Sequence, residues 1–389
     1  MDAFTPPAPP FHLGPDQQAV QDMARRFADE HLRPHALDWD QQKHFPLATI
    51  RQAAPLGIGG IYVPEEFGGS GLSRLDAALI FEALATGCPA ISAYISIHNM
   101  VAGMIAKFGD PAQKQKYLPD LCAMHRLAAY CLTEPGSGSD AAALRTTAVK
   151  HGETYRLTGT KQFISGAGAV DLYAIMARTG ENGPKGISCF LVEAGAPGLS
   201  FGANEKKMGW NAQPTRQVIL DNVEIPAANR LDAEGRGFRI AMTGLDGGRL
   251  NIGACSLGGA QAALEIALGY VQQRHAFGRP IADFQALQFR LADMATELEA
   301  ARLLLWHAAA ALDAASPHAT KLCAMAKRLA TDTGFTVANN ALQLLGGYGY
   351  LADYGIEKLV RDLRVHQILE GTNEIMRVII AREVLEKNK

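Results

Sequence analysis

A carboxylate near the end of the sequence stands in an apolar stretch, where it can act as a base. Glu370 follows Ile368 and Leu369 in the segment QILEGTNEIMR (367–377), and Gly371 leaves backbone room beside it. Apolar surroundings raise the pKa of a carboxyl by desolvation, and its ionised form is then a stronger proton acceptor. Glu370 is therefore a candidate general base. The plainer alternative is that Glu370 precedes the last helix and interacts favourably with its dipole.

A segment rich in glycine and serine, YCLTEPGSGSD (130–140), follows a predicted strand. Small residues let backbone N–H groups approach a ligand, and hydroxyls and amides can hold a polar ring edge or a phosphate. An ordinary Gly/Ser turn has the same composition. Gly136, Gly138 and Ala141 also spell G-x-G-x-x-A, a dinucleotide-binding pattern that needs an acidic residue ~20 positions further on. Lys161 stands there and strands follow, so we exclude this pattern.

Three further segments place glycines beside charged or aromatic residues. DGGR (246–249) lies at the head of a predicted helix, where each glycine costs roughly 1 kcal/mol and is usually offset by close packing or a ligand. RHAFG (274–278) supplies Arg274, which can pair bidentately with a phosphate. QLLGGYGY (343–350) has more glycines than a helix end needs, which favours a tight loop against a flat or phosphorylated ligand. The alternatives are a local ion pair for DGGR, a solvated charge for RHAFG and a plain helix end for QLLGGYGY.

Length and composition exclude several classes of protein. The 389 residues predict two or three domains, and 48% hydrophobic with 20% charged residues is typical of a globular protein with a sizeable core. A net charge of −2 argues against a partner such as nucleic acid or an anionic membrane. No apolar run approaches the ~18 residues of a membrane span, and the Pro- and Ala-rich start lacks targeting features. We therefore expect a cytoplasmic bacterial protein, with a processed mitochondrial-matrix protein as the alternative.

The cysteines and histidines give no sign of a metal site or a disulfide framework. The histidines lack metal-ligand spacing, so no metal is predicted. The cysteines lack C-x-x-C spacing, which predicts buried thiols in a reducing compartment. They are Cys88, Cys122, Cys131, Cys189, Cys255 and Cys323.

Hydrophobic spacing divides the chain into three zones. Residues 1–125 have the spacing of helices, and residues 126–235 are richer in glycine and β-branched residues that alternate with turn signals. Residues 236–389 return to the spacing of long helices. The order of helices, strands and helices argues against a doubly wound α/β sheet, in which strands and helices alternate. The middle zone predicts an antiparallel barrel or sandwich.

Five elements within these zones have the strongest patterns. Helices are predicted over 16–27 and 75–85, from apolar residues spaced three and four apart. A strand is predicted over 172–176, where apolar residues alternate. An apolar seam over 287–305 and a stretch over 319–345 that stops at a glycine pair predict two long helices.

The segments YCLTEPGSGSD, RHAFG, LLGGYGY and ILEGTNEIMR, in this order and spacing, resemble those of the acyl-CoA dehydrogenase family, and the resemblance runs from about residue 12 to the end. It implies an α+β multi-domain fold with an N-terminal α-helical domain (1–125), a middle β-barrel domain (126–235) and a C-terminal four-helix bundle (236–389). It also implies FAD between the last two domains, completed by a neighbouring subunit of a homotetramer, a dimer of dimers. The implied partners are an acyl-CoA substrate and an electron-transferring flavoprotein as electron acceptor.

The resemblance also assigns residues to the cofactor and the substrate. Beside the flavin it places Tyr130, Leu132, Thr133, Gly138 and Ser139, with Phe163, Ile164 and Ser165 near the isoalloxazine. By the adenosine or pyrophosphate half it places Thr372, Asn373 and Glu374. At the adenosine end, expected to belong to the FAD of a partner subunit, it places Arg274, Phe277, Phe284, Gln285, Gln343, Leu344, Gly346 and Gly347. For substrate contacts it gives Ser139, Asp246, Arg249 and Arg382 near CoA, with Leu369 and Gly371 near the acyl group.

Glu370 matches the family's catalytic base. One branch carries its base at the position of Gly248, which has no carboxylate here, so the resemblance implies the layout of short- and medium-chain members. In that layout the glutamate removes the α-proton while the β-hydride passes to the flavin. Many straight-chain members have Tyr before the base, whereas Leu369 leaves room for a branched α-carbon. The expected reaction is the desaturation of isobutyryl-CoA to methacrylyl-CoA in valine catabolism.

Other substrates and other classes of protein stay open at this stage. Butyryl-, 2-methylbutyryl- and propionyl-CoA are alternatives, because one methylene is worth about 1–3 kcal/mol of discrimination in an apolar pocket. An acyl-CoA oxidase is a second alternative, although oxidases of this kind are usually longer. A third is a catalytically silent protein that binds acyl-CoA or flavin, against which the intact Glu370 argues. Phe284 departs from the commoner pattern, since some members have His there.

Overall fold

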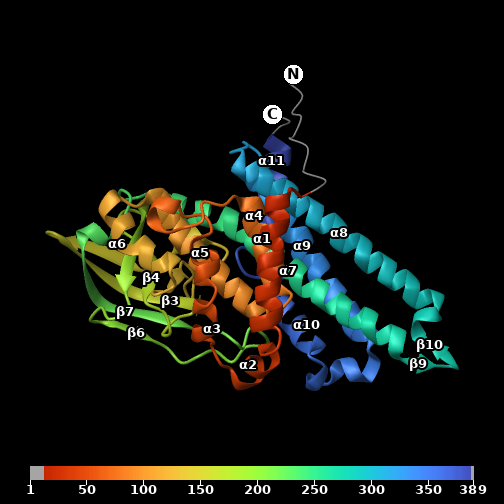
Figure 1. Ribbon diagram of the computed structural model, residues 1–389. Helices are drawn as coiled ribbons and strands as arrows, with labels where there is room; N and C mark the ends of the chain where they lie inside the picture. The colour runs from red at the N-terminus through yellow and green to blue at the C-terminus, as the bar shows by residue number, and fades with distance from the viewer. Residues whose placement is uncertain (1–12, 387–389) are drawn as a thin grey trace.

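The computed structural model describes residues 13–386 and contains helices, then a sheet, then a second set of helices. The sheet lies at one end of the molecule, and the longest helices extend away from it toward the other end (Figure 1). The predicted fold class, with helical parts on both sides of a β part in the chain, is confirmed. The predicted limits at residues 125 and 235 fall in connections between elements.

The elements follow one another in three groups, connected by turns and short 3-10 helices. The first group comprises α1 (Pro15–Phe27), α2 (Ala36–Gln42), α3 (Leu47–Arg51), α4 (Arg74–Ala85), α5 (Pro89–Phe108) and α6 (Pro111–Cys122). The second comprises β1 (Ala128–Cys131), β2 (Thr147–His151), β3 (Thr154–Ser165), β4 (Leu172–Arg178), β5 (Ile187–Glu193), β6 (Leu199–Phe201), β7 (Thr215–Pro226) and β8 (Arg230–Leu231). The third comprises α7 (Gly237–Gln273), β9 (His275–Ala276), β10 (Arg279–Pro280), α8 (Gln285–Asp313), α9 (Ala319–Leu344), α10 (Ile356–Arg364) and α11 (Asn373–Glu386).

The strongest helix predictions are confirmed by α1, α4, α8 and α9. Local chemistry explains where these helices begin and end. Ser73 caps α4 by accepting a hydrogen bond from the Asp76 N–H, and the Asp76 carboxylate accepts from the Ser73 N–H, a reciprocal capping box. Beyond α9, Gly346 has a φ of +59°, the left-handed conformation that glycine adopts without strain.

Two helices correct an expectation from the sequence. By length and composition, α5 and α7 are apolar enough to cross a membrane, so the prediction that no segment approaches such a span is wrong. Both helices are mostly buried by the rest of the protein, as the core helices of a globular fold are. In α7 the chain also places DGGR (246–249) well inside the helix and not at its head.

Strands β1 to β8 form one sheet in the order β6-β7-β3-β2-β4-β5-β8, with β1 paired to β4, and β9 and β10 form a separate two-stranded sheet. Most pairs are antiparallel, as predicted, but β4 pairs in parallel with β1 and β2. The predicted alternation in β4 does not appear as alternating burial, because its residues from Leu172 to Ala177 are buried on both faces. Helix α7 packs against β4 and β5 in addition to the neighbouring strands. The periodicity of this strand therefore could not reveal which face meets the core.

Helix α7 is the centre of the C-terminal part, and it packs against α8 and α9 as well as against α4 and α5. Its close approach to α4 depends on Gly258, where a Cβ would overlap the carbonyl oxygen of Glu82. The helices therefore pack with backbone against backbone along this stretch. All six cysteines are free and buried, which confirms that prediction.

Asp362, which forms a buried ion pair within α10, also joins the sheet region to the C-terminal helices through a hydrogen bond from Trp210. The Lys358 ammonium of α10 lies 2.6 Å from Asp362 Oδ2, and the backbone N–H of Trp210 donates to Asp362 Oδ1 at 2.6 Å. Asp362 is 0% exposed, so both of its oxygens depend on these partners. This contact fixes the start of the chain segment that leads from α10 to Glu370.

We expect Asp362→Ala to lower the free energy of unfolding by about 3–5 kcal/mol, because it leaves the buried Lys358 ammonium without its partner. The matched control is Asp353→Ala on an exposed turn, for which the change should stay within about 0.5 kcal/mol. Chemical denaturation of both variants measures the difference. Equal, small losses in the two variants would show that the ion pair does not hold this junction.

Candidate active site

Glu370 lies in the loop between a 3-10 turn (Val365–Gln367) and α11, and its backbone is left-handed. The φ angle is +53° at Glu370 and +90° at Gly371. Residues with a side chain rarely adopt positive φ, and such strain persists only where the surroundings hold it. A Cβ at position 371 would also press against Met376, so glycine suits this position for two reasons.

The carboxyl of Glu370 is withdrawn from water. The residue is half-buried, but its Oε2 is fully buried and makes no hydrogen bond with any residue from 13 to 386. Burial raises the pKa of Glu370 to about 7, against the opposing charges of Arg249 and Lys327, which lower it. The predicted rise in pKa is therefore confirmed. A carboxyl with this pKa is well matched to proton abstraction near neutral pH.

Helix α7 makes room for this carboxyl at Gly248. A Cβ built on Gly248 would overlap Glu370 Oε2, so the helix surface is hollowed where the Glu370 carboxyl sits. The two positions where the family carries its base are thus neighbours in space. Only one of them can hold a carboxylate here, and that one is Glu370.

Arg249 joins the base loop to the substrate residues predicted on α7. Its Nη1 lies 2.7 Å from Asp246 Oδ1, and its Nε donates to the backbone oxygen of Glu370 at 3.4 Å. Asp246 Oδ2 accepts a hydrogen bond from Thr320 Oγ1 at 2.9 Å. Asp246 and Arg249 therefore form an ion pair, as their spacing predicts, but this pair is part of the site and not only a surface contact.

The loop that carries Glu370 is also held by α9, through residues of this helix that the sequence did not indicate. The Lys327 ammonium donates to the Gly371 carbonyl and to Asn373 Oδ1, both at 2.9 Å. Asn373 Nδ2 donates in turn to Thr331 Oγ1 at 3.0 Å and to Asp332 Oδ1 at 2.7 Å. The feature of the sequence that could have indicated this network is Lys327, a lysine on the buried face of an otherwise apolar helix.

This network includes one residue that was predicted near the cofactor. The side chain of Asn373 is buried and bonded to α9, and its place beside the adenosine or pyrophosphate half of a cofactor stays a prediction. Its neighbours are placed differently: Thr372 Oγ1 accepts from the Ile375 N–H at the start of α11, and Glu374 is exposed.

The segment after β1 is anchored by a second buried ion pair that the sequence did not indicate. Lys161 Nζ lies 2.7 Å from Glu134 Oε1 and also donates to the Leu132 carbonyl at 3.1 Å. The Glu134 carboxylate accepts further bonds from the N–H groups of Arg145 and Thr146. Glu134 therefore shapes the glycine-rich turn and does not face a ligand.

The residues predicted beside a flavin fall into exposed and buried groups. Phe163 is 63% exposed at a φ of +59°, in the irregular part of β3 opposite β7, so its ring is presented outward. The side chain of Ile164 instead is buried in the core, and its position near the isoalloxazine stays a prediction. The Tyr130 hydroxyl is buried without a hydrogen-bond partner among residues 13–386, as expected of a group that meets a ligand. The other predicted members are Leu132, which is buried, Thr133 and Ser165, which are half-buried, and Gly138 and Ser139, which are exposed.

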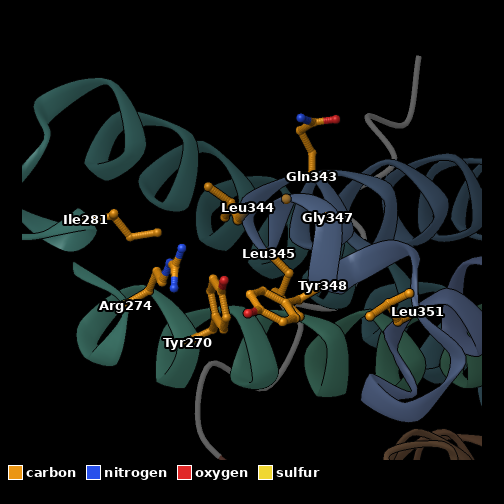
Figure 2. Close-up of a pocket in the computed structure, with 10 residues that line it drawn as sticks. Tyr270, Arg274, Ile281, Gln343, Leu344, Leu345, Gly347, Tyr348 and Leu351 are labelled. Carbon is orange, nitrogen blue, oxygen red and sulfur yellow. The ribbon is translucent and has the colours of Figure 1, made fainter. Parts of the chain in front are cut away.

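A pocket of about 470 Å³ lies at the far end of α7 from the sheet. Figure 2 shows Tyr270 of α7 and Arg274, which follows this helix, facing Leu345 and Tyr348, with the Gln343 amide turned away from them. The Arg274 guanidinium lies 5.7 Å from the Tyr348 ring centre, which leaves its donors available to a ligand. The predicted residues that line this pocket are Arg274, Gln343, Leu344, Gly346 and Gly347.

The remaining predicted residues lie near this pocket or on the outer helices. Phe277 is 95% exposed at the tip of the β9–β10 hairpin and packs edge-on against Phe284, with Gln285 following at the start of α8. Arg382 is exposed on α11, and no hydrogen bond or ion pair joins it to Asp246 or Arg249 in the described part of the chain. Its predicted contact with CoA therefore stays a prediction.

Three family models match the chain in series: the acyl-CoA dehydrogenase N-terminal domain at residues 14–125, the middle domain at 129–223 and the C-terminal domain at 235–385. The chain belongs to the acyl-CoA dehydrogenase family. It is 53% identical to the mitochondrial isobutyryl-CoA dehydrogenase of Bos taurus and 54% identical to that of Dictyostelium discoideum, each over 97% of this chain and 91% of the relative. Relatives also include a bacterial acyl-CoA dehydrogenase from Bacillus subtilis, at 44% identity over 96% of this chain and 99% of the relative.

Solved structures agree with this assignment. Butyryl-CoA dehydrogenase from Megasphaera elsdenii is similar with a TM-score of 0.94 and 38% identity, over 96% of this chain and 99% of that one. A chain in a structure described as an electron transferring flavoprotein of Acidaminococcus fermentans has the same TM-score and coverage, with 42% identity. An FAD complex of PigA has a TM-score of 0.93 and 32% identity, over 96% of this chain and 98% of that one.

The raised pKa of Glu370 predicts how pH acts on stability. The folded pKa of about 7 exceeds the ordinary value of 4.5, so folding favours the protonated carboxyl, and this stability is lost as pH rises through 7. Glu370→Gln has no carboxyl to ionise, so this variant does not lose that stability. We therefore expect the free energy of unfolding of the variant minus that of the parent protein to rise by about 2–3 kcal/mol from pH 5 to pH 8. Urea denaturation at a series of pH values measures this. A difference that does not change with pH would contradict the buried carboxyl.

Proposed function

We propose that the protein desaturates isobutyryl-CoA to methacrylyl-CoA, a step of valine catabolism, with Glu370 as the catalytic base. The observation that carries this proposal is the buried Glu370 carboxyl, with a free oxygen and a pKa near neutrality, against the Gly248 hollow. The isobutyryl group is favoured by 53–54% identity to two isobutyryl-CoA dehydrogenases over nearly the whole chain. The protein is an oxidoreductase of the acyl-CoA dehydrogenase family that uses FAD.

The chemistry needs a base and a donor at the thioester carbonyl, because the α-hydrogen of a thioester is only weakly acidic. Glu370 takes the α-proton with its ionised carboxylate. The backbone N–H of Glu370 makes no hydrogen bond with residues 13–386, so it is available to the carbonyl oxygen on which negative charge develops. The left-handed backbone at Glu370 places this N–H and the carboxylate in one loop, and Arg249 steadies that loop through its bond to the Glu370 oxygen.

The residues beside this loop fit FAD. A buried tyrosine hydroxyl without a partner, an outward-facing Phe163 and an open glycine-rich turn at Gly136 and Gly138 leave polar and flat surfaces for a flavin. Tyr130, Thr133, Ser139 and Ser165 would hold its polar edge, and Phe163 would pack against the ring. When bound, FAD supplies the acceptor for the β-hydride. Asp246, Arg249 and Ser139 are the proposed contacts of the CoA chain.

The pocket at the far end of α7 fits the adenosine end of a cofactor that belongs to a second subunit. Gly248 lies inside α7 and Arg274 directly follows its last residue, 26 residues later, so a rise of 1.5 Å per residue separates them by ~39 Å. One chain therefore presents the base beside the body of α7 and a ligand pocket at the end of this helix. This arrangement supports the proposed homotetramer, in which subunits exchange these ends.

Two further assignments belong to the same proposal. An electron-transferring flavoprotein is the proposed electron acceptor, a partner that fits the family and one of the similar structures. The cytoplasm of a bacterium stays the predicted location, with the mitochondrial matrix as the alternative. Both can be tested by oxidising the reduced protein with a purified electron-transferring flavoprotein and by fractionating the source cells.

We expect Glu370→Gln to keep FAD but to lose turnover by about 10²–10⁴-fold or more, because the amide cannot accept the α-proton. The measurement is the loss of the flavin's visible absorbance when substrate is added without oxygen, beside the ratio of flavin to protein. Near-normal reduction in a variant that retains FAD would exclude Glu370 as the base.

The acyl group is tested by anaerobic titration with isobutyryl-, butyryl-, 2-methylbutyryl-, isovaleryl- and propionyl-CoA. We expect the fastest bleaching with isobutyryl-CoA, because Leu369 leaves a wall smaller than a tyrosine beside the α-carbon. One methylene is worth about 1–3 kcal/mol, or 10–200-fold, in such a pocket. Faster reduction by butyryl-CoA would assign a short-chain substrate, and no bleaching by any thioester would leave a protein that only binds flavin.

A further inference from the structure

We propose that Lys327 is the positioning residue of the catalytic base: its buried ammonium holds the loop that carries Glu370 and supplies the positive charge that keeps this carboxyl ionised. The inference rests on the proposed function of Glu370 and deepens it. It assigns a role to a residue that contacts neither the reacting atoms nor the predicted cofactor residues except Asn373.

The geometry of the clamp is direct. Lys327 is 0% exposed in the middle of α9, and its Nζ donates to the Gly371 carbonyl and to Asn373 Oδ1, each at 2.9 Å. These acceptors immediately follow the left-handed Glu370 and Gly371. The hydrogen bonds therefore hold the loop at Gly371 and Asn373, at the end of the strained turn.

Lys327 differs from the other buried lysines in its partners. Lys161 lies 2.7 Å from Glu134, and Lys358 lies 2.6 Å from Asp362, so each buried ammonium touches a carboxylate. Within residues 13–386 the hydrogen bonds of the Lys327 ammonium go to neutral oxygens only. A buried charge without a direct counter-ion is costly, so a negative charge must lie close by.

That negative charge is Glu370. Burial lowers the pKa of Lys327 to about 8, and Glu370 is the strongest influence that raises it, ahead of Asp332 and Glu374. The influence is mutual, since Lys327 and Arg249 both lower the pKa of Glu370. The ammonium and the carboxylate thus stabilise each other's charged form across the loop without touching.

The other titratable groups around the base do not replace this charge. From α7, Arg249 is already paired with Asp246, and Cys255 has its pKa raised to about 12 by burial, so it is a neutral thiol. From β1, burial raises the pKa of Tyr130 well above its ordinary value, so the phenol is neutral as well. Burial, and then the charge of Lys327, lower the pKa of His366 to about 3, which leaves the imidazole neutral. Lys327 and Arg249 are therefore the two cations that act on Glu370.

The test compares three variants as FAD-loaded enzyme, using anaerobic flavin bleaching by a saturating acyl-CoA across the pH range. We expect Lys327→Met to move the rising limb of the rate profile upward by about 1 pH unit or more, because an opposite charge at this range lowers a carboxyl pKa by about 1–3 units. The rate at neutral pH then falls about tenfold and recovers at alkaline pH. Lys327→Arg keeps the charge, so its limb should stay close to that of the parent enzyme.

The matched control is Thr331→Val, which removes a hydroxyl that bonds Asn373 in the same buried network without changing a charge. We expect it to weaken the fold but to leave the rising limb in place. A limb that does not move in Lys327→Met, or a rate lowered equally at every pH, would overturn the proposal. A shift of equal size in Lys327→Arg or Thr331→Val would overturn it too, because loop packing and not charge would then set the limb.

A second measurement does not depend on turnover. The measurement compares the free energy of unfolding of Glu370→Gln with that of its parent over a range of pH, once in the original protein and once in a Lys327→Met background. The midpoint pH at which the variant gains stability over its parent should lie higher in the Lys327→Met background, by about the same amount as the shift in the rate profile. Lys327→Gln replaces Lys327→Met if the methionine variant does not fold. If no thioester bleaches the flavin, the proposed function fails while this stability cycle still decides the role of Lys327. If the pH at which Glu370→Gln gains stability does not move, the proposed role of Lys327 is overturned even in an active enzyme.

Discussion

The structure depends on keeping one carboxyl oxygen, Glu370 Oε2, out of water without a hydrogen-bond partner among residues 13–386. Glu370 has to be buried for its pKa to rise to about 7, yet an unpaired buried carboxylate is costly, so the surrounding elements must hold it. Helix α7 hollows its surface at Gly248, α9 fixes the loop from below, and the left-handed turn keeps the side chain between them. The long glycine-containing α7 and the lysine inside α9 are both consequences of this requirement.

The elements that carry this site were largely predictable, because their information is local. Hydrophobic spacing located α1, α4, α8 and α9, and a carboxylate beside aliphatic residues pointed to Glu370. The length of α7 was not predictable, since its glycines at 247 and 248 read as a helix start. Those glycines make sense only with distant side chains lying against them, Arg74 against Gly247 and the carboxyl of Glu370 against Gly248.

The contacts missed from the sequence are the ones that join distant segments. Lys161 with Glu134, and Lys327 with Asn373, are pairs of buried polar groups whose partners no spacing rule could identify. The same limit applies to two residues that were predicted near the cofactor. The sequence did not show that the side chain of Ile164 is buried in the core, where β3 is irregular, or that the side chain of Asn373 is bonded to α9.

The length of α7 has a consequence for how the protein keeps its cofactor. The helix places the hollow at Gly248 and the pocket at Arg274 ~39 Å apart. In the proposed homotetramer, where this pocket receives the cofactor of a partner subunit, no single chain would enclose a whole cofactor. Subunit association and cofactor retention would then be one linked equilibrium, in which dilution releases the cofactor and added cofactor draws the subunits back together by mass action.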